Sequence, residues 1–179
     1  MDEARQLREG GVGIIPTDTL YGIVASALKP EAVERIYRLK SRMPVKPPII
    51  LLASNEDLAL FGVSPTPAQL KVLQTYWPGP TSIVLPCGAE TFAYLHRGAN
   101  SLAFRVPNDQ KLQAFLHESG PLIAPSANLE GQPPAVTVAA ARAYFGDAVG
   151  FYIDGGVIEG RASTIIRVSE DGAVEILRK

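Results

Sequence analysis

Five consecutive apolar residues, Ile49-Ile-Leu-Leu-Ala53, constrain the fold of this chain more than any other stretch of its sequence. Side chains alternate between the two faces of a β-strand, so an extended segment of this composition presents apolar groups on both faces. Strands of this kind are typical of sheets that are covered on both sides. We therefore expect a central sheet whose faces are buried by packed elements.

Strand-like and helix-like patterns alternate along the rest of the chain. The expected strands are residues 12–15, 23–27, 49–53, 82–85, 101–106, 122–124, 150–153, 163–168 and 174–177. The expected helices are residues 2–9, 30–40, 69–76, 108–118 and 137–145. This interleaving predicts an α/β fold, with a mixed twisted sheet and helices packed on it.

The length and composition of the chain limit its organisation and location. With 179 residues and 46% hydrophobic residues, the chain fits a single domain, residues 1–179. The single cysteine, Cys87, excludes an intrachain disulfide and suits a reducing compartment. It follows an apolar run, which favours a buried thiol over a nucleophile. Neither a leader segment nor an apolar run of the ~20 residues that span a membrane is apparent. We predict a cytoplasmic protein.

The predicted strand at residues 101–106 has one apolar and one polar face. Leu102, Phe104 and Val106 share one face, while Ser101, Ala103 and Arg105 share the other. A hydroxyl, a methyl and a guanidinium suit the floor of a cleft that binds an anion. The alternative is that Arg105 points into solvent from a half-exposed sheet.

Two further segments carry polar groups next to predicted strands. Residues 125–134 (PSANLEGQPP) follow a strand directly, where ligands of α/β sheets often bind, and Ser126 and Asn128 can both bond phosphate or ribose. The alternative is a surface loop in which both side chains bond their own backbone. Residues 16–22 (PTDTLYG) combine hydroxyls with a carboxylate, which suits either a small polar ligand such as an amino acid or a capped turn.

Cations gather just before the apolar run. From Glu34 to Lys46 there are five cations and one acid, in a chain of formal net charge −1. Arg38 and Lys40 can be explained as cations at the end of a helix. Arg42 and Lys46 lie beyond that helix, so with Lys40 they predict a clamp for a polyphosphate. The spacings of Cys, His, Asp and Glu predict no metal site, and neither common nucleotide-binding glycine motif is present.

In their order and spacing, these motifs resemble those of the YrdC-type threonylcarbamoyl-AMP synthases, in a short single-domain form. The resemblance covers residues 13–168 and includes the K-x-R pair of Lys40 and Arg42, which a related branch lacks. The motifs that carry it are PTDTLYG (16–22), KSR (40–42), WPGP (77–80), SLAFRVP (101–107), PSANLEGQPP (125–134) and STI (163–165). It implies a YrdC-like three-layer fold.

The resemblance also implies an activity, its substrates and the residues that bind them. ATP, L-threonine and bicarbonate would give threonylcarbamoyl-AMP and pyrophosphate. The product would pass to a tRNA threonylcarbamoyl transferase complex, which makes threonylcarbamoyladenosine in tRNA. Mg²⁺ would arrive with ATP and need no protein cage. The residues implied for ATP are Arg42, Lys46, Ser101, Ser126, Asn128 and Arg178. Those implied for threonine are Thr19, Arg105, Ala124 through its backbone, and Ser163. Lys40 and Arg42 would stabilise charge at the phosphates, and no acid–base residue is expected.

The sequence departs from the family pattern in two places, and two other functions are compatible with parts of it. Leu51 stands where some relatives carry a histidine in the threonine pocket, and longer relatives append a second domain. An RNA-binding module without adenylating activity is the main alternative. The pI near 6.1 and the 7% aromatic content count against it, although weak RNA binding is compatible with the synthase reading. A carbamoyl-transfer domain of a larger assembly would be expected to carry zinc-type cysteine motifs.

Overall fold

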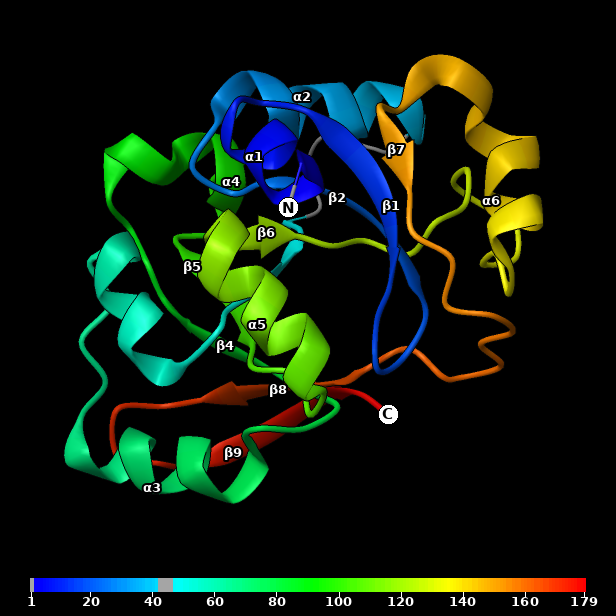
Figure 1. The fold of residues 1–179 in the computed structure, drawn as a ribbon. Helices are drawn as coiled ribbons and strands as arrows, with labels where there is room; N and C mark the ends of the chain where they lie inside the picture. Colours follow the sequence, from blue (N-terminus) through cyan, green and yellow to red (C-terminus); the bar gives the residue numbers. More distant parts are fainter. Residues whose placement is uncertain (1, 42–46) are drawn as a thin grey trace.

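One mixed sheet organises the computed structural model, which describes residues 2–41 and 47–179 (Figure 1). The strands run in the order β7-β1-β2-β6-β3-β5-β4-β8-β9. Their bounds are β1 (Val12–Pro16), β2 (Tyr21–Ser26), β3 (Ile49–Leu51), β4 (Thr81–Pro86), β5 (Ser101–Arg105), β6 (Leu122–Ile123), β7 (Phe151–Tyr152), β8 (Thr164–Val168) and β9 (Val174–Arg178). The pairs β1–β7, β3–β5 and β4–β8 are parallel and the other pairs are antiparallel, which confirms the expected mixed sheet.

Three of the helices begin at a residue whose side chain caps the first turn. The side chains of Thr66, Asp109 and Thr137 accept hydrogen bonds from backbone N–H groups in the first turns of the helices that follow them. The helices are α1 (Asp2–Arg8), α2 (Pro30–Leu39), α3 (Pro67–Tyr76), α4 (Ala93–His96), α5 (Gln110–Ser119) and α6 (Val138–Phe145). Three 3₁₀ segments complete them: η1 (Asn55–Phe61), η2 (Glu90–Phe92) and η3 (Gly146–Ala148). In the described part of the chain, no helix is long and apolar enough to cross a membrane.

Alternation along β3 and the residue after it divides the core into two layers. Ile50 and Leu52 belong to the larger cluster, which receives side chains from α2, α3, α4 and α6. Leu51 belongs to the smaller cluster, which receives side chains from α1 and α5. Figure 1 shows α1 and α5 together on one side of the sheet. The fully apolar run therefore separates two helical layers, and the three-layer fold is confirmed.

Two details of the chain differ from the sequence-based expectations. The strand expected over residues 49–53 ends at Leu51, because the carboxylate of Asp57 accepts from the backbone N–H groups of Ala53 (2.8 Å) and Ser54 (3.3 Å) and begins η1 there. The 3₁₀ segments and α4 were not anticipated, since they are too short for a helical period. Cys87 is buried as expected, with its thiol 3.5 Å from the carbonyl oxygen of Phe61.

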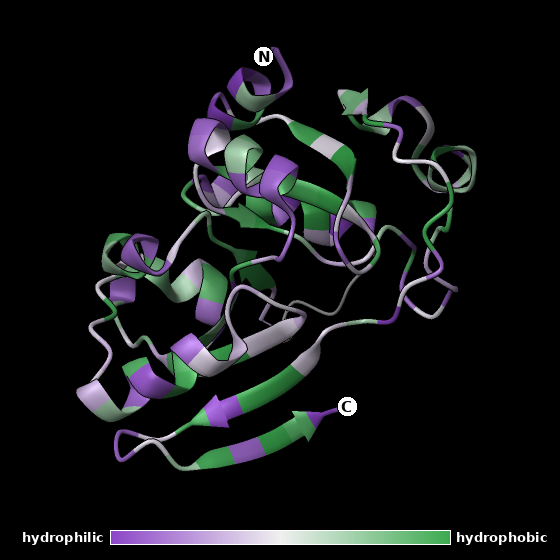
Figure 2. Cartoon of the chain, turned by 60° about the horizontal axis from the view of Figure 1, so that its bottom comes forward, coloured by the Kyte–Doolittle hydropathy of each residue, from purple (hydrophilic) through white to green (hydrophobic). Residues whose placement is uncertain are grey.

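The α1/α5 layer covers only part of its face of the sheet. Its cluster reaches Leu51 in β3 but includes no side chain of β4, β5 or β8. On this same face, Arg105 lies beside Leu51 in the parallel register of β3 and β5. The face carries partly exposed or polar side chains from there onward, and Figure 2 shows the β8–β9 hairpin at the border of the sheet. The predicted polar face of β5 therefore lies where the helical cover stops.

Candidate functional site

A small polar pocket lies at this border. Its volume of about 160 Å³ equals roughly five water molecules at ~30 Å³ each, which suits a ligand the size of an amino acid. Its lining comes from the β1–β2 turn, the start of β3, the end of β5, the loop after β6, and the segment around β8 and β9. The lining residues are Thr17, Thr19, Leu20, Tyr21, Gly22, Pro47, Ile49, Arg105, Ala124, Pro125, Ser126, Ala162, Ser163, Ile165 and Arg178.

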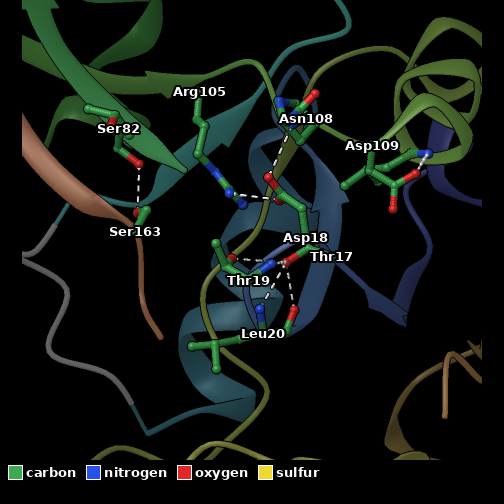
Figure 3. Close-up of polar contacts among 12 residues, drawn as sticks. Thr17, Asp18, Thr19, Leu20, Ser82, Arg105, Asn108, Asp109 and Ser163 are labelled. Atoms are coloured by element: carbon green, nitrogen blue, oxygen red, sulfur yellow. Dashed lines mark hydrogen bonds and ion pairs between the residues drawn. The ribbon is translucent and has the colours of Figure 1, made fainter. Parts of the chain in front are cut away.

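The β1–β2 turn presents hydroxyl groups to this pocket. The Thr17 hydroxyl donates to the carbonyl oxygen of Leu20 (2.6 Å) and accepts from the backbone N–H groups of Thr19 (3.2 Å) and Leu20 (3.1 Å). The hydroxyls of Thr17 and Thr19 lie 3.1 Å apart (Figure 3). Bonds of this kind fix a turn without help from the rest of the chain. Thr17 therefore orders the turn, and Thr19 offers its hydroxyl at the pocket.

Arg105 is one of two cations that line the pocket, the other being Arg178, and its side chain is only 4% exposed. Its Nη1 donates to Oδ1 of Asp18 at 2.7 Å (Figure 3). Within the described residues, its Nε, which is buried, and its Nη2 have no hydrogen-bond acceptor. Burial lowers the pKa of Arg105 and Asp18 opposes this, so the guanidinium stays charged. A buried cation with an unused Nε–Nη2 edge is suited to bind a carboxylate side-on.

Ser163 is held at the opposite wall by hydrogen bonds with Ser82 and Arg178. Its hydroxyl lies 2.8 Å from that of Ser82, which is fully buried on β4. Its carbonyl oxygen accepts from Nη2 (2.7 Å) and Nε (3.2 Å) of Arg178. The preceding segment lies close to the β1–β2 turn, because a Cβ atom at Gly160 would be only 1.8 Å from the carbonyl oxygen of Thr19. Ser163 is therefore fixed relative to Thr19, and Arg178 reaches the same wall.

The loop after β6 forms the third side of the pocket. The backbone N–H of Ala124 donates to the carbonyl oxygen of Ile49 (3.0 Å), so a backbone contact from Ala124 to a ligand is left to its carbonyl group. Ser126 forms a bridge with Gly22 of β2. Its hydroxyl donates to Oδ1 of Asn128 at 2.6 Å, so toward a ligand the oxygen can act only as an acceptor.

Lys40 does not line the pocket as a free cation, in contrast to our expectation. Its ammonium group is 3% exposed and donates to the backbone carbonyl of Ser126, the backbone carbonyl of Asn128 (2.6 Å) and Oδ1 of Asn128 (3.1 Å). An ammonium group has three hydrogens to donate, and these three acceptors account for them. Lys40 therefore fastens the end of α2 to the loop.

Asn128 likewise serves the loop rather than the pocket. Its Oδ1 accepts from Lys40 and Ser126, while its Nδ2 donates to the carbonyl oxygens of Leu129 (2.9 Å) and Gln132 (2.6 Å). This is the self-satisfied loop that the sequence left open as an alternative. A direct bond from the Asn128 amide to ATP would require these contacts to break.

Lys40→Met should lower the stability of the protein, because it leaves several buried carbonyl oxygens without a donor. Hydrogen bonds to charged groups contribute ~1.5–3 kcal/mol each, so we expect a loss of about 3 kcal/mol in the free energy of unfolding. In a chain of this length that lowers the Tm by roughly 6–12 °C. A thermal melt measures the change, with the exposed Lys71→Met on α3 as the matched control. A Tm equal to that of wild type would contradict this role of Lys40.

Two other residues singled out by the sequence, Ser101 and Leu51, do not line the pocket. Ser101 lies on the same sheet face as Arg105 but at the other end of β5, about 13 Å away at ~3.3 Å per residue, and lines a separate hollow with Arg167. Leu51 is fully buried under α1 and α5, and Ile49, two residues earlier, lines the pocket instead. Arg42 and Lys46 lie outside the described residues, so their predicted contacts with ATP stay predictions.

A larger hollow of about 510 Å³ lies beside the pocket and shares Thr17 with it. Its wall is mostly apolar and includes Phe115 and Ile158. It lacks both guanidinium groups of the smaller pocket, Arg105 and Arg178, so we assign the site to the smaller one. Among the described residues, no cluster of three His, Cys, Asp or Glu side chains is arranged for a metal ion.

Two functional neighbours escaped the sequence reasoning. Asp18 was noticed only as a carboxylate within its motif, and Ser82 only as the start of a strand. Both act through residues more than 80 positions away, Arg105 and Ser163. The apolar-polar alternation of β4 places Ser82 on the polar face, but the local sequence does not predict that Ser82 contacts Ser163.

Comparisons with known proteins agree with this fold and site. A family model for Sua5, YciO and YrdC, described as "Telomere recombination", matches residues 5–179. The threonylcarbamoyl-AMP synthase of Bacillus subtilis is 35% identical over 173 residues, which are 94% of this chain and 49% of that protein. The threonylcarbamoyl-AMP synthase of Halorhodospira halophila is 32% identical over 172 residues, 95% of this chain and 90% of that protein.

A solved structure, Pyrococcus abyssi Sua5 complexed with L-threonine, is similar to the whole fold. The TM-score is 0.90 at 32% sequence identity, and the match covers 99% of this chain and 52% of that chain. The chain thus spans about half the length of the Bacillus and Pyrococcus relatives it matches.

Proposed function

Because the chain belongs to the Sua5/YciO/YrdC family, we propose that it is an L-threonylcarbamoyladenylate synthase, which converts ATP, L-threonine and bicarbonate to threonylcarbamoyl-AMP and pyrophosphate. The observation that carries the proposal is Arg105, a buried guanidinium that lines a pocket of amino-acid size and whose Nε and Nη2 have no acceptor among the described residues. The names of the relatives support the same activity.

Threonine would bind between the two walls of the pocket. Its carboxylate would take the free edge of Arg105, since side-on pairing of guanidinium and carboxylate combines charge with two hydrogen bonds. The polar groups of threonine would form hydrogen bonds with the hydroxyls of Thr19 and Ser163 and with the carbonyl group of Ala124. The partly exposed Ile49 would contact its methyl group.

ATP would lie next to threonine, over the uncovered face of the sheet. Ser126 and Arg178 line the pocket at this side, which supports their predicted contacts with ATP. Ser101 lies farther along the same face, so it would meet a distant part of the nucleotide. Arg42 and Lys46 would meet the phosphates by the resemblance alone, and Mg²⁺ would enter with ATP on those phosphates.

The proposed chemistry needs positioned charge more than covalent help from the protein. The threonine amine and bicarbonate form an N-carboxylate with loss of water. An oxygen of this carboxylate attacks the α-phosphorus of ATP, and the bond to pyrophosphate breaks. The protein would bring two anions together and stabilise charge at phosphorus, as the cations of the site allow. No general acid or base is required from the side chains named here.

Pyrophosphate release tests the proposal directly. The purified protein should release pyrophosphate from Mg-ATP only when both threonine and bicarbonate are present. Omission of either should reduce the rate to that of the protein-free control. A rate of pyrophosphate release that does not depend on threonine or on bicarbonate would contradict the proposal.

Threonine should be preferred over serine by roughly ten- to two-hundredfold in kcat/KM. The two differ by one methyl group, and an apolar contact discriminates a methylene by only about 1–3 kcal/mol. Ile49, which lines the pocket, would supply this apolar contact in place of Leu51. Pyrophosphate release at varied concentrations of each amino acid measures the ratio, and equal values would exclude a methyl-sensing wall.

We extend the proposal to the destination of the product. Threonylcarbamoyl-AMP is a mixed anhydride that water hydrolyses, so its consumer would be a tRNA threonylcarbamoyl transferase complex in the same compartment. The single buried cysteine supports a cytoplasmic location. A role as an RNA-binding module without adenylating activity is not favoured, because Lys40 of the basic segment is committed to the loop.

A further inference from the structure

Asp18 makes contacts that the proposed activity does not by itself explain. Its Oδ1 accepts from Nη1 of Arg105 at 2.7 Å, and its Oδ2 accepts from the backbone N–H of Asn108 at 3.1 Å (Figure 3). The side chain is 11% exposed. One carboxylate therefore joins the β1–β2 turn to the end of β5 and to the entry of α5.

Asp18 lies behind the pocket, within the part of the chain that the structure describes. Its neighbours Thr17 and Thr19 both line the pocket, whereas Asp18 contacts it only through Arg105. Side chains alternate along the turn, so Thr17 and Thr19 lie at the pocket and the carboxylate of Asp18 lies against the guanidinium of Arg105. An effect of Asp18 on a ligand must pass through Arg105.

The geometry of the pair decides which part of Arg105 a ligand can use. Asp18 binds Nη1 alone, end-on, and leaves Nε and Nη2 without an acceptor among the described residues. These two nitrogens form the edge that pairs side-on with a carboxylate. A guanidinium released from Asp18 would be free to rotate about its side-chain bonds and to lose this alignment.

We propose that Asp18 is the positioning residue that fixes Arg105 with its Nε–Nη2 edge toward the carboxylate of the amino-acid substrate. The inference rests on the proposed function, since it deepens the account of the same pocket. It assigns to the aspartate of the PTDTLYG motif a role distinct from that of its threonines, which face the ligand. Asp18 itself does not touch the substrate.

Two opposing effects follow from removal of the carboxylate. Loss of a negative charge near Arg105 favours binding of an anionic group, while loss of alignment disfavours it. The two donors bind different oxygens of Asp18, and Asp18→Asn keeps the size of the side chain but replaces one of these oxygens by an NH2 group, which cannot accept, so the contact made there is lost. Misplacement of a binding group by about 1 Å can cost ~100-fold. We expect the alignment to dominate.

The test is a double-mutant cycle on kcat/KM for threonine, measured by pyrophosphate release at saturating Mg-ATP. Asp18→Asn should lower kcat/KM by roughly 10- to 100-fold, with most of the change in the KM for threonine and little in that for ATP. In the Arg105→Ala background, Asp18→Asn should change kcat/KM by less than about twofold, because its effect passes through Arg105. Asp171→Asn, in the β8–β9 turn where Oδ1 accepts from Ala173, is the matched control and should equal wild type.

The outcomes separate this inference from the proposed function. Wild type that releases no pyrophosphate with threonine and bicarbonate refutes the function itself. Active wild type combined with an unchanged or lower KM in Asp18→Asn refutes the positioning role. A further large loss from Asp18→Asn in the Arg105→Ala background also refutes it, since Asp18 would then support the fold independently of Arg105.

Discussion

Arg105→Ala should raise the threonine concentration needed for half-saturation by roughly 30-fold or more, while Mg-ATP binding changes little. Truncation of one partner in a buried, hydrogen-bonded charge pair costs ~2–5 kcal/mol, part of which reflects the partner left unpaired. At 1.4 kcal/mol per tenfold change, this corresponds to about 30- to 4,000-fold in affinity. Arg105 is buried, lines the pocket and has two nitrogens without an acceptor among the described residues, so the effect should approach the upper part of this range.

Calorimetry with threonine and with Mg-ATP, each titrated alone, measures both affinities. Arg142→Ala is a suitable control, because Arg142 stacks on the ring of Tyr152 away from the pocket lining. Arg105→Lys should recover only part of the affinity, since a lysine cannot pair side-on with a carboxylate. Equal weakening of threonine and ATP binding would contradict the assignment of Arg105 to threonine.

Arg42→Ala should slow pyrophosphate release by roughly 10²- to 10³-fold, or about 2.7–4 kcal/mol, at saturating substrates. Loss of one charge aimed at the reacting phosphate removes stabilisation that develops in the transition state. A residue that binds a ligand and makes no packing contact contributes little to the stability of the fold. The free energy of unfolding should therefore change by no more than about 0.5 kcal/mol. Arg42→Lys should recover only part of the rate, because a point charge lacks the bidentate grip of a guanidinium.

Rate measurements are paired with a thermal melt for each variant. Arg38→Ala is the control, because Arg38 is an exposed cation in the last turn of α2 and precedes the K-x-R pair. It should match wild type in both rate and Tm. An Arg42→Ala variant that turns over normally, or that fails only because it has unfolded, would show that these cations form a solvated helix end and no phosphate clamp.

Local periodicity explains why the fold and Arg105 were predictable from the sequence. The apolar run at residues 49–53 specified burial on both faces, and the two clusters that share β3 confirm it. Alternation along β5 predicted that Arg105 and Phe104 lie on different faces of the sheet, with Arg105 on the face away from the main core. Both inferences use only the two-residue period of a strand, which does not depend on distant parts of the chain.

Lys40 and Asn128 show where such reasoning fails. The acceptors of Lys40 lie 86 and 88 residues away, so a local excess of cations cannot reveal whether an ammonium group faces a ligand or a carbonyl oxygen. Leu51 was misplaced for a related reason. Ile49 and Leu51 share one strand face, and only the extent of the α1/α5 layer decides which of them is covered.

Recovery of labelled carbon in the product tests the central claim most directly. The protein is incubated with Mg-ATP, L-threonine and ¹³C-bicarbonate. The nucleotides are then separated, and their masses are measured by mass spectrometry. The account predicts an AMP adduct that contains threonine and one ¹³C atom and appears together with pyrophosphate. An adduct of AMP and threonine without the label, or AMP and pyrophosphate with no adduct when hydrolysis is prevented, would contradict it.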